Sequence, residues 1–289
     1  MNQCINVKPA VFAFDLCRLW IERAAMFRSV LFVPCANPKA MAKAHGLIVD
    51  ALIFDLEDAV GDSQRDGALA ALAQALKTGG FSAKTLLVRI HPQYINATYK
   101  ALHGLMFDGL VVPKVGNPED LRGLMNLWPK VPVWAMIETA EGVANLWEIA
   151  GMPLRGLIAG PNDLRQSLHS RPMLERQDIL FALSQIVLHG RANTLVVLDG
   201  VYNAFQDEAG FISECAQGRS LGFDGKTLIH PSQIKACEAA FNPSDSEIEW
   251  AREVTAAFED TQAGVVTVKG QMVERLHLEA ARRILETKT

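Results

Sequence analysis

Short, nearly continuous runs of apolar residues recur along the chain, and segments with helical features separate them. Strands that are buried on both faces show continuous apolar runs rather than alternation, so each run predicts a strand of a parallel sheet. The predicted strands are Ser29–Val33, Ala51–Asp55, Leu86–Ile90, Gly109–Pro113, Val133–Ile137, Gly156–Ala159, Thr194–Leu198 and Gly225–Ile229.

The segments between these runs carry signals that begin and end helices. Asn37-Pro38 and Asn117-Pro118 each place a capping side chain before a proline, which is typical of a helix start. Gly79-Gly80 is expected to end the alanine- and leucine-rich helix that follows Ser63. Eight strands alternating with helices favour an α/β fold, the (β/α)8 TIM barrel. A doubly wound sheet is the alternative, but the chain has no glycine-rich dinucleotide-binding loop.

Two segments lie outside this count. Residues 28–241 hold the predicted barrel, and residues 1–27 form a predicted N-terminal helical extension with a helix over Leu16–Ala25. Residues 242–289 form a C-terminal extension, which we expect to serve as a packing arm between subunits, as a lid over an active site, or as both.

The C-terminal extension has a pattern of its own. Ser244 and Glu247 form a capping box that begins a helix to about Glu259. An alternating strand over Val265–Val268, a turn at Gly270 and an amphipathic helix to Leu285 follow. The extension is therefore expected to contain two helices joined by a hairpin-like element.

Composition narrows the function classes. The chain has 289 residues, 49% of them hydrophobic, and a net charge of −4, which excludes a broad basic surface for nucleic acid or an anionic membrane. No run approaches the ~20 apolar residues of a membrane helix. The five cysteines show no C-x-x-C spacing, which favours a reducing compartment and a cytoplasmic protein. The cysteines are Cys4, Cys17, Cys35, Cys215 and Cys237.

Acidic residues dominate the positions that directly follow the predicted strands. In a barrel these positions meet at one mouth, where active sites lie. Glu138 and Asp163 follow neighbouring strands and are well placed to share Mg²⁺, which prefers oxygen ligands and commonly uses only one or two carboxylates. The alternative is that either acid caps the following helix.

Two basic residues lie among these acids. Arg89, at a strand end, needs an anionic partner, which is either a ligand or a carboxylate such as Asp55 or Glu57. Lys114 can form a Schiff base or pair with a carboxylate. His91 and His230 each precede a proline, and neither is assigned a role in proton transfer.

Several motifs, in the same order along the chain, resemble the citrate lyase β-subunit-like group of the HpcH/HpaI aldolase superfamily. These motifs are Arg28–Pro34, Phe54–Val60, Val88–Ile90, Pro113-Lys114, Ile137–Thr139 and Gly222–Pro231. The resemblance runs from about Arg28 to Leu285. It implies a TIM barrel, Mg²⁺, a homotrimer or a dimer of trimers, and an acyl-CoA substrate, with coenzyme A as part of that substrate. The long tail resembles stand-alone malyl-CoA and citramalyl-CoA lyases.

Site residues follow from the resemblance position by position. Glu138 and Asp163 match metal ligands, and Arg89 matches the arginine that faces the thioester oxygen. Asp58 and Glu57 match acids that hold metal-bound waters, Asp58 being assigned as catalytic and Glu57 as substrate-binding. Substrate contacts are also implied for Arg28, Pro113 and Lys114.

The chain departs from the family pattern at three positions. Glu274 stands where related enzymes carry an aspartate that reaches a neighbour's active site and handles a proton, so a catalytic role is implied for Glu274 with one extra methylene. Cys35 replaces a glycine, and His91 stands where asparagine is common.

The expected activity is Mg²⁺-dependent carbon–carbon cleavage of a 3-hydroxyacyl-CoA. The preferred substrate is citramalyl-CoA, whose cleavage yields acetyl-CoA and pyruvate. Alternatives are a malyl-CoA or citryl-CoA lyase or thioesterase, a CoA-independent pyruvate aldolase, and a non-catalytic subunit of a lyase complex. Malyl-CoA and citramalyl-CoA differ by one methyl group, a difference that a pocket discriminates by only ~1–3 kcal/mol.

Overall fold

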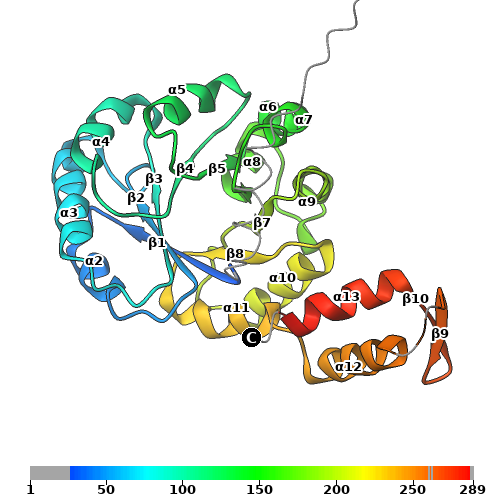
Figure 1. Cartoon of the computed structure of the whole chain (residues 1–289). Coiled ribbons are helices and arrows are strands. Elements are labelled where there is room, and N and C mark those ends of the chain that lie inside the picture. The colour runs from blue at the N-terminus through cyan, green and yellow to red at the C-terminus, as the bar shows by residue number, and fades with distance from the viewer. Residues whose placement is uncertain (1–26, 260, 262, 287–289) are drawn as a thin grey trace, which may run out of the picture.

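Eight parallel strands form a closed barrel in chain order, each paired with its neighbours and β8 paired with β1 (Figure 1). The structure, a computed structural model, describes residues 27–259, 261 and 263–286. The predicted TIM barrel is confirmed, and every strand lies within two residues of its predicted bounds. The strands are β1 (Ser29–Pro34), β2 (Ala51–Asp55), β3 (Thr85–Arg89), β4 (Gly109–Val112), β5 (Val133–Ile137), β6 (Gly156–Ala159), β7 (Val196–Asp199) and β8 (Gly225–Leu228).

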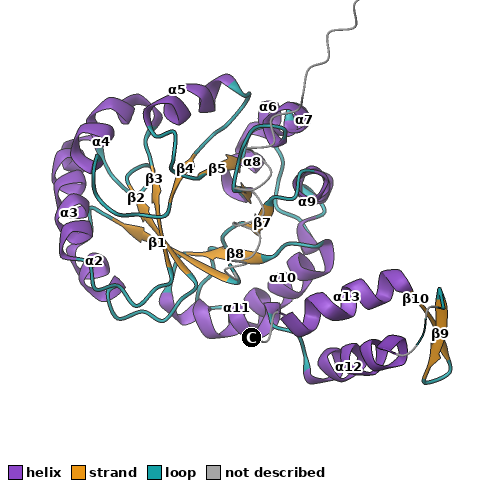
Figure 2. Cartoon of the chain, in the orientation of Figure 1, coloured by secondary structure: helices purple, strands orange, loops and turns teal. Residues whose placement is uncertain are grey.

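Helices surround the barrel, as Figure 2 shows by its outer ring of coiled ribbons. They are α2 (Pro38–Ala44), α3 (Arg65–Thr78), α4 (Ile95–Leu102), α5 (Glu119–Leu127), α6 (Ala140–Ala144), α7 (Leu146–Ala150), α8 (Pro161–Leu168), α9 (Leu180–Ala192), α10 (Glu208–Leu221) and α11 (Ile234–Phe241). The Asn37 side chain accepts hydrogen bonds from the first N–H groups of α2, and Gly79 ends α3 with a φ of 64°, as predicted. The predicted helix over Leu16–Ala25 lies outside the described residues.

Apolar side chains pack on both surfaces of the barrel wall. Most of them lie between the strands and the surrounding helices, and a smaller cluster around Trp134 and Met136 fills the interior. Trp134 fits because a neighbouring strand carries Gly156, where a Cβ atom would lie 2.4 Å from the indole. The filled interior restricts ligands to the ends of the barrel.

The C-terminal extension forms an arm beside α10 and α11 that projects from the barrel (Figure 1). Helix α12 (Asp245–Glu259) packs on α13 (Arg275–Glu286), and β9 (Val265–Val268) pairs antiparallel with β10 (Gln271–Glu274). The arm has an apolar cluster of its own, separate from the barrel's. The predicted capping box is present and the predicted turn lies between the two strands, while the domain boundaries at residues 28 and 242 stay predictions.

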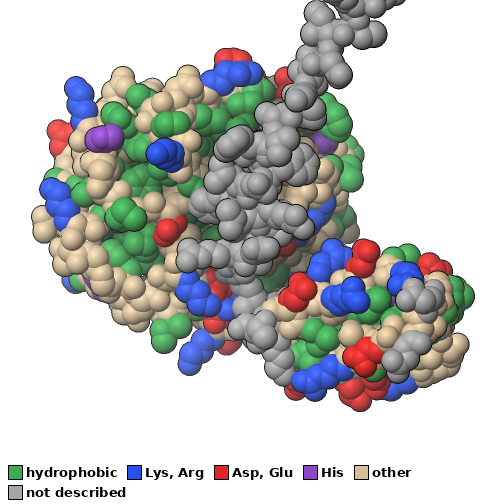
Figure 3. All heavy atoms as spheres, in the orientation of Figure 1, with side chains coloured by type: hydrophobic (Ala, Val, Ile, Leu, Met, Phe, Trp, Pro, Cys, Tyr) green, Lys and Arg blue, Asp and Glu red, His purple; other side chains and the backbone are tan. Residues whose placement is uncertain are grey.

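Acidic and basic side chains are interspersed over the arm and scattered over the barrel on the face that Figure 3 shows. No helix in the described part of the chain is long and apolar enough to cross a bilayer.

Candidate active site

A cavity of about 380 Å³ opens where the carboxyl ends of the strands meet. Four predicted site residues line it together, each of them following or ending a different strand. These residues are Asp58, Arg89, Glu138 and Asp163. The remaining lining includes Asp55, Phe32, Pro34, Met136, Gly160, Asn162, Val201, Asn203, Thr227 and Ile229.

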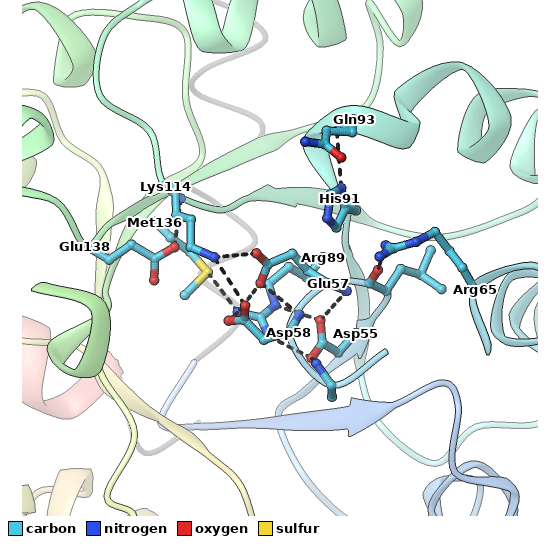
Figure 4. A network of polar contacts seen from close by, with 12 residues as sticks. Asp55, Glu57, Asp58, Arg65, Arg89, His91, Gln93, Lys114, Met136 and Glu138 are labelled. Carbon is cyan, nitrogen blue, oxygen red and sulfur yellow. Dashed lines mark hydrogen bonds and ion pairs between the residues drawn. The ribbon is translucent and has the colours of Figure 1, made fainter. Parts of the chain in front are cut away.

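Arg89 ends β3 and is held by Asp55, the residue that pairs with it at the end of β2. Its Nε and Nη2 each donate to a different Asp55 oxygen at 2.7 Å, and Nη1 lies 3.3 Å from Asp58 (Figure 4). The alternative that Arg89 pairs with Asp55 is therefore confirmed. The guanidinium also lines the cavity, so the ion pair fixes its orientation toward a ligand.

The electrostatic surroundings keep Arg89 charged. Burial acts to lower the pKa of Arg89, but the hydrogen bonds with Asp55 and the charges of Asp55, Glu57 and Asp58 outweigh it and raise the pKa. The ring of Phe32 lies 4.8 Å from the guanidinium carbon on one side. Arg89 thus presents a fixed positive charge in the lining of the cavity.

Lys114 lies between the two acids that follow β2. Its Nζ is 2.7 Å from Glu57 Oε1 and 3.2 Å from Asp58 Oδ1 (Figure 4). Burial acts to lower the pKa of Lys114, but the hydrogen bond with Glu57 and the nearby negative charges raise it above its usual value. A lysine that is held protonated is a poor nucleophile, so the structure supports pairing with a carboxylate over Schiff-base chemistry.

Glu138 follows β5 and is 1% exposed. Its Oε1 accepts a hydrogen bond of 2.7 Å from the Lys114 backbone N–H, and that residue has the unusual φ of 52°. Its Oε2 lies against Gly160, where a Cβ atom would come within 2.2 Å of it. Only glycine therefore leaves room for this carboxylate next to β6.

Asp163 lies in the first turn of α8 and is half-buried. Its side chain makes no capping hydrogen bond to that helix, and no hydrogen bond or ion pair of its carboxylate occurs among the described residues. The alternative that Asp163 caps a helix is therefore not supported. A half-buried carboxylate without a partner at a cavity wall is a free oxygen ligand.

The donor set of Glu138 and Asp163 fits a hydrated Mg²⁺ ion. Each contributes a carboxylate to the cavity lining, and Glu138 Oε2 has no hydrogen bond within the described part of the chain. No group of three or more His, Cys, Asp or Glu side chains with metal-binding geometry occurs there either. Mg²⁺ commonly binds through one or two carboxylates and keeps several waters, whereas Zn²⁺ needs more protein ligands.

We expect Mg²⁺ to bind more weakly below neutral pH. Burial raises the pKa of Glu138 to about 7, and the charge of Asp163 adds to this effect. The carboxylate is ionised above that pKa and neutral below it, so protons compete with the cation as the pH falls. Mg²⁺ affinity, measured by calorimetric titration, should fall about fivefold between pH 7 and pH 6 and level off above pH 8. An affinity that is constant from pH 6 to 8 would contradict this prediction.

Five predicted site residues lie outside the cavity lining. Glu57 and Lys114 form the ion pair described above, beside Asp58. The other three lie elsewhere. Arg28 precedes β1 and binds Asp50, which precedes β2, through Nε and Nη2 at 2.9 Å each. It lies at the opposite end of the barrel, so its predicted substrate contact is wrong. Pro113 is buried and does not line the cavity, and Glu274 ends β10 on the arm.

The sequence did not single out Asp55, Gly160 or Asn203 as parts of the site. Asp55 was considered only as a partner of Arg89, although its position at a strand end is the same signal that identified Glu138. Gly160 and Asn203 carry no charge and therefore gave no chemical signal. Asn203 exchanges hydrogen bonds with Asn162 across the mouth, which links the segments after β6 and β7.

Comparisons with known proteins agree with this arrangement. Residues 28–231 match the family model described as HpcH/HpaI aldolase/citrate lyase. The chain is 43% identical over 271 residues to a (3S)-malyl-CoA thioesterase of Cereibacter sphaeroides, covering 91% of this chain and 95% of that protein. It is 29% identical over 296 residues to a mitochondrial citramalyl-CoA lyase of Mus musculus, covering 91% and 86%.

A solved structure has the same fold. The protein CitE from Mycobacterium tuberculosis, in complex with magnesium, acetoacetate and coenzyme A, superposes with a TM-score of 0.77 at 29% identity, covering 91% of this chain and 98% of that one. The family model and the shared fold confirm the family and the enzyme class that the motifs predicted. The chain belongs to the HpcH/HpaI aldolase/citrate lyase family and is a carbon–carbon lyase of that family.

Proposed function

We propose that the protein cleaves the carbon–carbon bond of a 3-hydroxyacyl-CoA to acetyl-CoA and a 2-oxo acid. The observation that carries this proposal is the convergence of Arg89, Glu138 and Asp163 on one cavity. The sequence favoured citramalyl-CoA as substrate. The relative named for malyl-CoA is 43% identical and the one named for citramalyl-CoA is 29% identical, so we place malyl-CoA first.

Glu138 and Asp163 would hold the Mg²⁺ ion, which when bound supplies Lewis-acid polarisation of the substrate's hydroxyl and carboxylate. Asp58 is ionised at neutral pH: burial raises its pKa, but hydrogen bonds with Glu57 and Lys114 and the charge of Arg89 bring it below its usual value. Asp58 can therefore hold a water or accept the hydroxyl proton. Glu57, paired with Lys114, positions that ammonium beside the substrate.

Arg89 stabilises the negative charge that develops on the thioester oxygen as the carbon–carbon bond breaks. Its Nε and Nη2 both donate to Asp55. The remaining nitrogen, Nη1, lies next to Asp58 and Met136, which line the cavity, so Nη1 is the donor proposed to face the thioester oxygen. A fixed donor that needs no reorganisation during the reaction provides this stabilisation most effectively. The enolate of acetyl-CoA then requires a proton at its terminal carbon.

Glu274 of a neighbouring subunit is our proposed source of that proton. Glu274 lies on the arm, which projects away from the barrel of its own chain (Figure 1). Because the arm projects from its own barrel, we propose that Glu274 reaches the mouth of a neighbouring subunit, and we retain the homotrimer, or dimer of trimers, as the proposed state. A cytoplasmic location also remains a proposal.

Thioester hydrolysis is the second candidate activity. The specific observation in its favour is the 43% identity to a protein named as a malyl-CoA thioesterase. Hydrolysis needs the same positive charge at the thioester oxygen, but it releases free coenzyme A and an intact hydroxy acid. The CoA-independent aldolase and the non-catalytic subunit have no comparable observation in their support.

A product assay separates these activities. The protein with Mg²⁺ is incubated with (3S)-malyl-CoA, with citramalyl-CoA and with the corresponding free acids. Lyase activity yields acetyl-CoA and a 2-oxo acid in equal amounts without free thiol, which chromatography and a hydrazone assay measure. Free thiol without a 2-oxo acid would instead establish hydrolysis, and turnover of the free acids would establish the aldolase. No product from any of these substrates would overturn the proposal.

A further inference from the structure

The lining of the catalytic cavity is divided into a charged half and an uncharged half. The charged side chains all follow or end β2, β3, β5 and β6. The segments from β7, β8 and β1, which are consecutive around the closed barrel, contribute no charged residue to the lining. Their apolar members are Val201, Ile229, Phe32 and Pro34.

A stacked pair of aromatic rings belongs to the two segments, after β7 and after β8, that supply Asn203 and Ile229 to this uncharged half. The rings of Phe205, in the segment after β7, and His230, after β8, have centroids 4.7 Å apart and an interplanar angle of 23°. Phe205 is 44% exposed, and Ile229, which precedes His230 and lines the cavity, is 39% exposed. Large apolar side chains that are exposed beside a cavity indicate a surface that a bound ligand covers.

Hydrogen bonds from one buried side chain fix both segments. Gln233 Oε1 accepts from the backbone N–H groups of Ile229 and His230, and its Nε2 donates to the Tyr202 carbonyl at 3.0 Å. The Phe205 N–H donates to the Asn203 carbonyl at 2.9 Å. The backbone segments that carry the two rings are thus held in place before any ligand arrives, which lowers the entropy cost of binding.

We propose that Phe205 and His230 form a platform on which the adenine ring of the coenzyme A portion of the substrate stacks. This inference rests on the proposed function, because it assumes a CoA thioester. The reacting end of such a substrate requires the charged half of the cavity. The pantetheine chain of the substrate then passes over the uncharged half. The adenine ring, which is the aromatic group of coenzyme A, meets the only stacked aromatic pair that adjoins this half among the described residues. Stacking on an aromatic side chain is the common way in which proteins hold a base without reading its edges.

The test compares substrates with and without adenine. Phe205→Ala should raise KM for the acyl-CoA about tenfold and leave kcat unchanged, because stacking acts on binding and not on the reacting atoms. The same variant should leave KM for the corresponding acyl-pantetheine, which lacks the nucleotide, unchanged. Phe205→Trp, which keeps an aromatic face, should restore the KM of the acyl-CoA. Phe181→Ala is the matched control, since that ring is 73% exposed on α9 and does not line the cavity.

A binding measurement separates this inference from the proposed function. Calorimetry with free coenzyme A, pantetheine and adenosine 3′,5′-bisphosphate should show that Phe205→Ala weakens the two nucleotide ligands about tenfold and leaves pantetheine unaffected. This pattern in a protein without turnover would support the platform and reject the lyase. Equal weakening of pantetheine, or no weakening of any ligand, would overturn the platform even in an active lyase.

Discussion

Replacing Arg89 by alanine is expected to lower kcat by about a hundredfold to a thousandfold, because removal of one charge-stabilising donor typically costs about 3–4 kcal/mol in the transition state. The reason lies in the geometry of the site. Asp55 fixes the guanidinium, and among the described residues Arg89 is the only basic one that lines the cavity. Steady-state turnover of malyl-CoA is the measurement.

The same substitution also affects stability, so a second variant is needed. Removing one partner of a buried ion pair leaves Asp55 as a buried unpaired charge, at a cost of about 3–5 kcal/mol. Arg89→Lys keeps the charge but loses the two-pronged contact, and we expect it to fold and to remain at least about a hundredfold slower than the wild type. Arg191→Ala, which removes a half-exposed ion pair with Asp224, is the control and should retain full turnover. Near-normal turnover of a folded Arg89→Lys variant would refute the role of Arg89.

Glu138→Gln is expected to abolish tight Mg²⁺ binding and, with it, turnover. Glutamine has nearly the same shape and can still accept the Lys114 N–H, but it has no charge for the cation. Because even outer residues of metal sites change affinity by about 10–100-fold, loss of a ligand should weaken Mg²⁺ binding by at least about a hundredfold. Calorimetric titration measures the affinity, and turnover over a range of Mg²⁺ concentrations shows whether excess metal restores activity.

The control for Glu138→Gln is the same change at Glu148, which is exposed on α7. Its Mg²⁺ affinity and turnover should equal those of the wild type. For the unmodified protein, EDTA should remove activity and added Mg²⁺ should restore it. Full turnover in EDTA would show that Glu138 and Asp163 serve another purpose.

The strands could be predicted from the sequence because a strand that is buried on both faces requires apolar residues at successive positions. Glu138 was identified for a related reason, since a charged residue directly after such a run has only the barrel mouth to occupy. The fold and the predicted metal site therefore follow from one pattern. Local sequence carries both signals, and no long-range information is needed.

The remaining features depend on contacts between distant segments. Arg28 was predicted to contact the substrate because it belongs to a motif shared with the family. Such a motif does not say at which end of the barrel a residue lies, and Arg28 precedes β1, at the end opposite the cavity. The Phe205 platform depends on Gln233 bringing two loops together, which no periodicity reveals. The arm's direction is likewise set by packing rather than by its own pattern of residues.

The arm and the barrel do not share a hydrophobic core, and this separation has an evolutionary consequence. Substitutions in α12 or α13 leave the packing around the strands untouched, so the appendage can diversify without endangering the scaffold that holds the catalytic groups. Proteins that share the catalytic barrel can thereby differ in their subunit contacts, and in the segment that covers the active-site cavity, through changes in the C-terminal arm alone.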